Sequence, residues 1–149
     1  MEDLQKQIKK AIEIYNKYAN LYALHTTPKL LQYQLNKFIT LLPKQPKILD
    51  AGCGVGRDSK YFKEENLDVT SIDISKGMIE EAKKHNIEVI KMNMKTLKFD
   101  KETFHGVWCM TSLSDIQKDF SEKVIKNFYK VLKKEGILYI STRHGIGEK

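Results

Sequence analysis

Residues 47–62 of the chain read KILDAGCGVGRDSKYF. A short apolar run ends in an acid, Asp50, and glycines follow at alternate positions, Gly52, Gly54 and Gly56. A helical pattern begins directly after them. This order predicts a strand, a tight glycine turn and a helix. In a parallel α/β sheet such a junction lies at the carboxyl end of a strand, where these folds bind their ligands.

The same residues indicate which kind of ligand the turn accepts. The dinucleotide fingerprint requires a third glycine where this chain has Arg57, and no Gly-Lys-Ser/Thr sequence ends the turn as in a P-loop. Asp50 would repel a pyrophosphate at short range but suits a ligand that carries an ammonium group. Glycines let the backbone approach that ligand without an intervening Cβ. We therefore expect a cationic nucleoside that carries an amino acid.

A second acid, Asp73, ends the next predicted strand, 21 residues beyond Gly52. An acid at this distance is placed to accept hydrogen bonds from both hydroxyls of a ribose. Because NAD-binding folds share this acid, it indicates adenosine and no more. Ser75 is then the predicted N-cap of a helix over residues 76–85.

The sequence Asp-Ala-Gly-Cys-Gly-Val-Gly, residues 50–56, resembles the first motif of class I S-adenosylmethionine-dependent methyltransferases. The resemblance implies that the acid and the glycine loop hold the methionine end of S-adenosyl-L-methionine. It also implies that the loop around Asn93 contacts adenine, although an Asp is usual at that position; the amide of Asn93 keeps an acceptor oxygen. Family members often begin with a segment like Tyr15–Tyr22, whose helix covers the cofactor.

The resemblance thus implies a set of cofactor-binding residues and one catalytic candidate. The cofactor-binding set is Asp50, Ala51, Gly52, Gly54, Gly56, Asp73, Ile74, Met78, Asn93, Met94 and Tyr22. Asp115 follows the fourth predicted strand, where many small-molecule relatives carry a His, and it or a tyrosine would accept a proton from the methyl acceptor. Alternatively, Ser112, Ser114 and Asp115 only cap the next helix.

Periodicity and turn residues predict the remaining elements. Helices are expected over residues 3–22, from Thr27 (N-cap) and Pro28 to residue 42, and over 120–133; strands are expected over 68–72, 87–91, 104–110 and 136–142. The resemblance implies an α/β fold: a Rossmann-like, doubly wound parallel sheet of five strands in the order 3-2-1-4-5, with two N-terminal helices, in one domain over residues 1–149.

The family usually adds two more strands, for which too few residues follow strand five. That strand would then be an edge, and its residues 137–140 are apolar. Long apolar edges promote aggregation unless they are covered. We therefore expect a second copy, giving a homodimer, or a partner subunit at this edge.

Composition narrows the class of protein. With 149 residues, 41% hydrophobic and 30% charged, the chain fits a water-soluble domain, and no apolar run approaches the roughly 20 residues of a membrane span. The N-terminus lacks the core of a signal peptide, so we expect a cytoplasmic protein. The two cysteines, Cys53 and Cys109, have no metal-site spacing. The net charge is +7, but only Arg57 and Arg143 are arginines, which disfavours nucleic acid as a partner.

The sequence therefore favours methyl transfer from S-adenosylmethionine to a small molecule. Two alternatives remain open: a non-catalytic or partner-dependent S-adenosylmethionine-binding subunit, and an RNA methyltransferase. The sequence does not identify the methyl acceptor.

Overall fold

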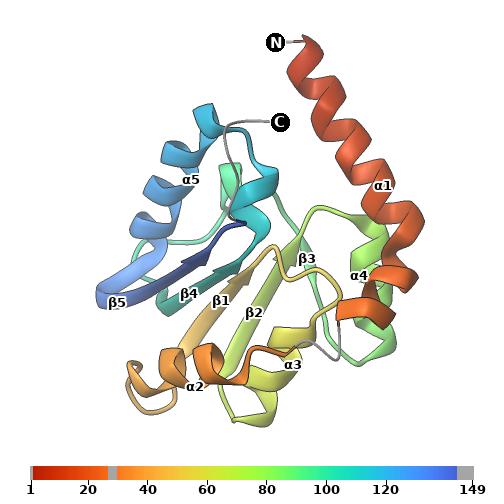
Figure 1. Ribbon diagram of the computed structural model, residues 1–149. Helices are drawn as coiled ribbons and strands as arrows, with labels where there is room; N and C mark the ends of the chain where they lie inside the picture. Colours follow the sequence, from red (N-terminus) through yellow and green to blue (C-terminus); the bar gives the residue numbers. More distant parts are fainter. Residues whose placement is uncertain (1, 27–29, 144–149) are drawn as a thin grey trace.

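The computed structural model describes residues 2–26 and 30–143 (Figure 1). Strands alternate with helices along most of the chain, as expected of an α/β fold. The elements are α1 (Glu2–Thr26), α2 (Gln32–Thr40), β1 (Lys47–Ala51), α3 (Arg57–Glu64), β2 (Asp68–Asp73), α4 (Lys76–Lys84), β3 (Ile90–Lys91), the 3₁₀ turn η1 (Met94–Thr96), β4 (Phe104–Met110), the 3₁₀ turn η2 (Ser112–Asp115), α5 (Lys118–Val131) and β5 (Leu132–Ser141).

The five strands form one parallel sheet in the order β3-β2-β1-β4-β5, which confirms the predicted topology. The arrowheads in Figure 1 accordingly all point to the same end of the sheet. In the register, Asp50 of β1 lies between Ser71 of β2 and Trp108 of β4. The loops that follow β1, β2, β3 and β4 are therefore brought together at the carboxyl edge.

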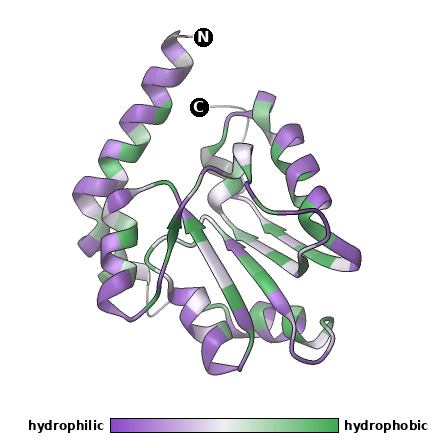
Figure 2. Ribbon diagram, turned by 180° about the vertical axis from the view of Figure 1, so that it is seen from behind, coloured by the Kyte–Doolittle hydropathy of each residue, from purple (hydrophilic) through white to green (hydrophobic). Residues whose placement is uncertain are grey.

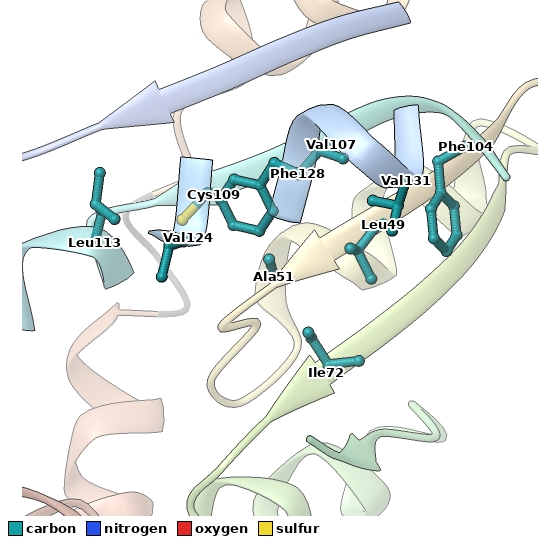
Figure 3. Close-up of a cluster of buried hydrophobic side chains, with 10 residues drawn as sticks. All are labelled: Leu49, Ala51, Ile72, Phe104, Val107, Cys109, Leu113, Val124, Phe128 and Val131. Carbon is teal, nitrogen blue, oxygen red and sulfur yellow. The ribbon is translucent and has the colours of Figure 1, made fainter. Parts of the chain in front are cut away.

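Alternation along the strands divides the core between the two faces of the sheet. Leu49 and Ala51 of β1 point to the face that α5 covers, where Val124 and Phe128 pack on them (Figure 3). Cys109 of β4 belongs to the same cluster. All five of these side chains are fully buried.

The opposite face is covered by α2 and α3. Ile48 of β1 and Trp108 of β4 pack there against Phe38 of α2 and Phe62 of α3. Three aromatic rings of this cluster pack edge-on or tilted, and Trp108 stacks on Tyr139 of β5 at 3.8 Å between centroids. Figure 2 shows green, hydrophobic segments within the strands, interrupted by polar ones, and both colours on the helices. The sheet thus has a buried face on each side, as parallel sheets require.

Several predicted boundaries were wrong. The first helix continues to Thr26, with a kink at Tyr18 (φ −111°), and α2 begins only at Gln32. The predicted start of α2, Thr27 and Pro28, lies outside the described residues. β3 has two residues, where the sequence predicted five.

The fifth strand also differs from its prediction. β5 begins at Leu132, four residues early, because a bulge lets Leu132 pair with Phe104 before Ile137 pairs with Gly106. Glu135, within the bulge, has a positive φ of 61°. Helix α5 correspondingly ends at Val131.

Among the described residues, β5 pairs with β4 alone, and its Leu138 is 36% exposed. The dimer or partner subunit expected at this edge stays a prediction. Within the same residues, no helix combines the length and the apolarity that crossing a bilayer demands.

Candidate functional site

A cavity of about 520 Å³ opens at the carboxyl edge of the sheet, between the strand tips and α1. Nine of the eleven predicted cofactor-binding residues line it: Asp50, Gly52, Gly54, Asp73, Ile74, Met78, Asn93, Met94 and Tyr22. Two do not. The side chain of Ala51 is fully buried in the core, and Gly56 caps α3 and faces Ile87.

Asp50 lies at the floor of this cavity and is 2% exposed. The Ser59 hydroxyl donates to its Oδ2 at 2.6 Å, and Ser59 and Ser71 share a further hydrogen bond at 2.7 Å. Burial, and then the charge of Asp58, raise the pKa of Asp50 to about 8, against the lowering effect of the Ser59 bond. At neutral pH the carboxyl is thus mostly protonated, and a cation beside it would favour the carboxylate.

The glycine turn is held by hydrogen bonds to β2. The amides of Gly52 and Cys53 both donate to the carbonyl of Ile72 at 2.9 Å, and the amide of Gly54 donates to Oδ2 of Asp73 at 2.9 Å. A Cβ on Gly52 would overlap Ser112, and one on Gly56 would lie 3.0 Å from Ile87. Packing therefore explains these two glycines.

Gly54 has a different reason to be glycine. Its φ is +57°, and among the described residues other than its two chain neighbours, the nearest atom to a Cβ there would be Cε1 of Tyr22 at 3.9 Å. Because Gly54 lines the cavity, the space above it belongs to the cavity. A side chain would therefore occupy space that is open to a ligand.

Asp73 has its carboxylate oriented by backbone amides. Ser75 N donates to Oδ1 and Gly54 N to Oδ2, both at 2.9 Å. Asp73 also lines the cavity. The two amides therefore fix the orientation of a carboxylate that borders the space open to a ligand.

The loop after β3 presents Asn93 and Met94 to the cavity. Asn93 caps η1, with its Oδ1 accepting from the amide of Lys95 at 2.9 Å. The side-chain amide of Asn127 on α5 donates to the carbonyls of Met94 (3.1 Å) and Lys95 (2.8 Å). These bonds fix the turn at a point where the ladder of β3 has already ended.

Helix α1 closes the cavity from above. Oδ1 of Asn16 accepts from the Ser75 hydroxyl and from the amide of Gly77, both at 2.8 Å, which ties α1 to the start of α4. Tyr15 and Tyr22, two turns apart, meet edge-to-face at 6.1 Å, and both line the cavity. The predicted position of Tyr22 over the site follows from this attachment.

Comparison with known proteins identifies the family. The family model described as a methyltransferase domain matches residues 48–136, which include β1, the glycine turn and most of the cavity floor. The chain belongs to the class I S-adenosylmethionine-dependent methyltransferases.

Two curated relatives illustrate the range of the family. The chain is 27% identical over 135 residues to a malonyl-[acyl-carrier protein] O-methyltransferase of Salmonella typhimurium, covering 86% of this chain and 51% of the relative. It is 30% identical over 148 residues to a ubiquinone biosynthesis O-methyltransferase of Coxiella burnetii, covering 95% and 61%. The chain thus spans about half to three-fifths of the length of these relatives.

The fold recurs in solved structures. The PH0226 protein of Pyrococcus horikoshii aligns with a TM-score of 0.68 at 28% identity, over 80% of this chain and 57% of that protein.

Sequence reasoning missed a buried ion pair beside the cavity of this methyltransferase domain. Arg57 Nε donates to Asp58 Oδ1 at 2.8 Å, and Trp108 Nε1 donates to Asp58 Oδ2 at 3.0 Å. The guanidinium also reaches the carbonyl of Thr26 (3.1 Å) and the sulfur of Met110 (3.1 Å). The sequence showed Arg57 only as a break in the dinucleotide fingerprint; the rarity of arginine in the chain was the available signal.

The two cysteines of the methyltransferase domain are poor nucleophiles. Cys53 lines the cavity, and burial, followed by the charges of Asp50 and Asp73, raises the pKa of its thiol well above the ordinary value. Burial raises the pKa of Cys109 to about 12. Because the thiolate is the reactive form, neither residue is activated for attack.

The catalytic candidate Asp115 belongs to η2, directly after β4, and its side chain lies outside the described part of the structure. Its role stays a prediction. Within the described residues, no three His, Cys, Asp or Glu side chains gather as metal ligands would.

Proposed function

We propose that the cavity binds S-adenosylmethionine and that the domain transfers its methyl group to a small molecule. The observation that carries this proposal is the order of the groups along the strand tips: a buried acid after β1, an oriented carboxylate after β2, and an amide oxygen after β3. This order matches the three parts of the cofactor: amino acid, ribose and adenine.

The methionine end of the cofactor would lie at the glycine turn. Asp50 is placed for the ammonium group, and Arg57 for the carboxylate, because Arg57 lines the cavity next to Gly56. One of its N–H groups donates to the sulfur of Met110 at 3.1 Å, a weak acceptor that a carboxylate would displace. The open space over Gly54 gives the ligand close access to the backbone.

The nucleoside would extend along β2 and β3. Asp73 would accept both ribose hydroxyls, and Asn93 would accept the exocyclic amine of adenine. Met94 and Met78 supply adaptable apolar contacts, and Ile74 and Tyr22 complete the lining.

When bound, the cofactor supplies a methyl group already activated by its sulfonium. The chain then has to align the acceptor with that methyl group and exclude water. Helix α1 serves the second purpose, because Ile8, Ala11 and Ile12 add an apolar wall to the cavity. The predicted proton acceptor, Asp115 or a tyrosine, belongs to this proposal.

Two features support a small-molecule acceptor. One relative reported above is named for ubiquinone biosynthesis, and the other for O-methylation of malonyl-[acyl-carrier protein], in which a small malonyl group is attached to a carrier protein. The cavity is also covered by α1, which leaves little room for a folded RNA. If the domain instead needs a partner subunit, the purified chain will bind the cofactor and form no product with any acceptor.

Calorimetry with S-adenosylhomocysteine, the demethylated product, tests the cofactor site. Asp73→Ala should weaken binding by about 1–3 kcal/mol, the scale of lost charge-assisted hydrogen bonds. Asp68→Ala is the matched control, because Asp68 is exposed at the opposite end of the same strand. Unchanged affinity in Asp73→Ala, or preferential binding of NAD or ATP by the wild type, would refute the proposal.

A further inference from the structure

Asn16 of α1 is hydrogen-bonded to the same turn that orients Asp73, where α1 lies beside α4 (Figure 1). Its Oδ1 accepts from the hydroxyl of Ser75 and from the amide of Gly77, both at 2.8 Å. The amide of Ser75 in turn donates to Oδ1 of Asp73 at 2.9 Å. Ser75 is buried, so its hydroxyl depends on a protein acceptor. One side chain thus joins the helix above the cavity to the carboxylate that we propose for the ribose.

Gly77 lets the backbones of α1 and α4 approach closely at this attachment. A Cβ on Gly77 would lie 2.6 Å from Cα of Asn16 and 2.7 Å from its carbonyl oxygen. Gly77 is the second residue of α4, and at a helical position alanine is intrinsically favoured over glycine. The glycine is therefore explained by the contact with α1 rather than by the conformation of α4.

The attachment lies between the two tyrosines that α1 presents to the cavity. Tyr15 directly precedes Asn16, and Tyr22 follows it by six residues. Both tyrosines line the cavity. Ala19, between them, is buried in one cluster with Val55 of the glycine turn. Movement of α1 away from α4 would therefore shift both tyrosines and open the cavity above the turn.

We propose that Asn16 is a positioning residue that keeps α1 closed over the bound cofactor and so sets the rate at which the cofactor leaves. This inference rests on the proposed function, because it takes the ribose to lie at Asp73, beneath α1. The Asn16 oxygen acts through Ser75 and Gly77 and need not touch the ligand. Without that oxygen, α1 separates from α4 more often, and each separation gives the bound ligand a path into solvent.

The experiment measures the two rate constants of S-adenosylhomocysteine binding. Displacement of the radiolabelled ligand by an excess of unlabelled ligand gives the dissociation rate constant, and mixing with free protein gives the association rate constant. Asn16→Ala should raise the dissociation rate constant about tenfold, because two hydrogen bonds are lost. The association rate constant should not fall, because the ligand enters through the open cavity in both proteins. A variant that only folded less well would reduce the amount of ligand bound and leave the dissociation rate constant unchanged.

Two further variants test the hydrogen bonds and the close approach of the helices separately. Asn16→Asp keeps an oxygen for Ser75 and Gly77, and it places a carboxylate at the first turn of α4, where a negative charge is favoured. Its dissociation rate constant should stay close to that of the wild type. Gly77→Ala keeps the Asn16 side chain but pushes α1 away through the added Cβ, so it should release the ligand faster, as Asn16→Ala does.

Asn20→Ala is the matched control, because it removes the same side chain one turn along α1, where Oδ1 of Asn20 accepts from the neighbouring amide of Leu21 at 2.8 Å. It should leave both rate constants unchanged. An unchanged dissociation rate constant in Asn16→Ala or Gly77→Ala, or an equal increase in Asn16→Asp or Asn20→Ala, would overturn the inference. In those cases normal S-adenosylhomocysteine binding by the wild type would leave the proposed function standing, whereas a wild type that fails to bind S-adenosylhomocysteine would overturn both.

Discussion

The Ser59 hydroxyl donates a 2.6 Å hydrogen bond to Oδ2 of Asp50, at the junction between the first strand and the cavity. Ser59 belongs to α3, and Asp50 points to the face that α3 covers. The acid that the sequence placed beside a ligand therefore also belongs to the buried polar core. One hydroxyl contact does not replace the water that the carboxylate loses, which is why the pKa of Asp50 rises to about 8.

The first prediction concerns stability against pH. The folded protein keeps the Asp50 proton up to about pH 8, whereas the unfolded chain releases it near 3.8. Between these values the folded state binds more protons, so the free energy of unfolding should fall as pH rises, by up to about 1.4 kcal/mol per pH unit. Asp50→Asn keeps the shape and removes the titration, so this part of the slope should vanish in urea unfolding curves measured from pH 6 to 8. Parallel pH profiles for the two proteins would contradict the assignment.

The second prediction links cofactor binding to proton release. The positive charge of S-adenosylmethionine should drive Asp50 to its carboxylate form, so roughly half a proton or more should leave per cofactor bound at pH 7. Affinity should accordingly rise with pH below 8. Calorimetry in buffers of different ionisation enthalpy measures this release directly. Asp50→Asn should bind S-adenosylmethionine more weakly and release fewer protons on binding. If both proteins release the same number of protons, the released proton comes from a group other than Asp50.

The third prediction separates two glycines of the turn. Gly54→Ala should lower the free energy of unfolding by about 1–2 kcal/mol, because alanine would have to adopt the left-handed conformation that Gly54 has. It should also weaken S-adenosylhomocysteine binding, because the added methyl group enters the cavity. Gly52→Ala should cost more stability, because its Cβ would overlap Ser112. Urea unfolding measures the stability of both variants, and calorimetry measures their affinity for S-adenosylhomocysteine. The assignment fails if Gly54→Ala binds as tightly as the wild type.

Local patterns predicted those parts of the fold that depend on local chemistry. The predicted fourth strand, residues 104–110, matches β4, and Ser75 caps α4 as predicted. Both features depend on residues that are close together in the sequence, so a local pattern indicates them. The sheet order followed from the family resemblance. β3 and β5 were predicted poorly because their lengths depend on pairing: within the described residues β3 borders β2 alone, and the bulge in β5 depends on β4.

The candidate site shows the same division. The acids and glycines of the strand tips could be read from spacing, since parallel strands bring successive tips to one edge. The Arg57–Asp58–Trp108 contacts join residues up to 50 positions apart, and the approach of Lys95 to Phe120 depends on how α5 packs. Such contacts leave no periodic signal in one sequence. Ala51 was predicted to bind the cofactor because of its place in the motif, but the alternation of side chains along β1 points it into the hydrophobic core.

The fourth prediction concerns the buried ion pair. Asp58→Ala would leave both Arg57 and Trp108 without their carboxylate, so a loss of about 3–5 kcal/mol is expected. Trp108→Phe removes one neutral donor and keeps the Arg57–Asp58 bond, so about 1–3 kcal/mol is expected. Urea unfolding followed by circular dichroism compares the two. A larger loss in Trp108→Phe would show that the stacking of Trp108 on Tyr139 outweighs the ion pair.

The fifth prediction tests how α5 positions the loop after β3, which we propose contacts adenine. Asn127 donates to two carbonyls of η1, at Met94 and Lys95, without lining the cavity itself. Asn127→Ala should raise the dissociation constant of S-adenosylhomocysteine about fivefold to thirtyfold, because part of the binding free energy would then be used to order the loop. Global stability should fall by only about 1 kcal/mol.

A positioning role makes a more specific claim than lost stability. Because Asn93 would accept from the exocyclic amine, the wild type should prefer S-adenosylhomocysteine over its inosine analogue, and Asn127→Ala should narrow that preference. Asn36→Ala serves as the control, since it removes an exposed contact with Tyr61 between α2 and α3, away from η1. It should leave both affinities unchanged. If Asn127→Ala weakens both ligands equally, Asn127 orders the loop without directing Asn93, and adenine selectivity must come from other contacts.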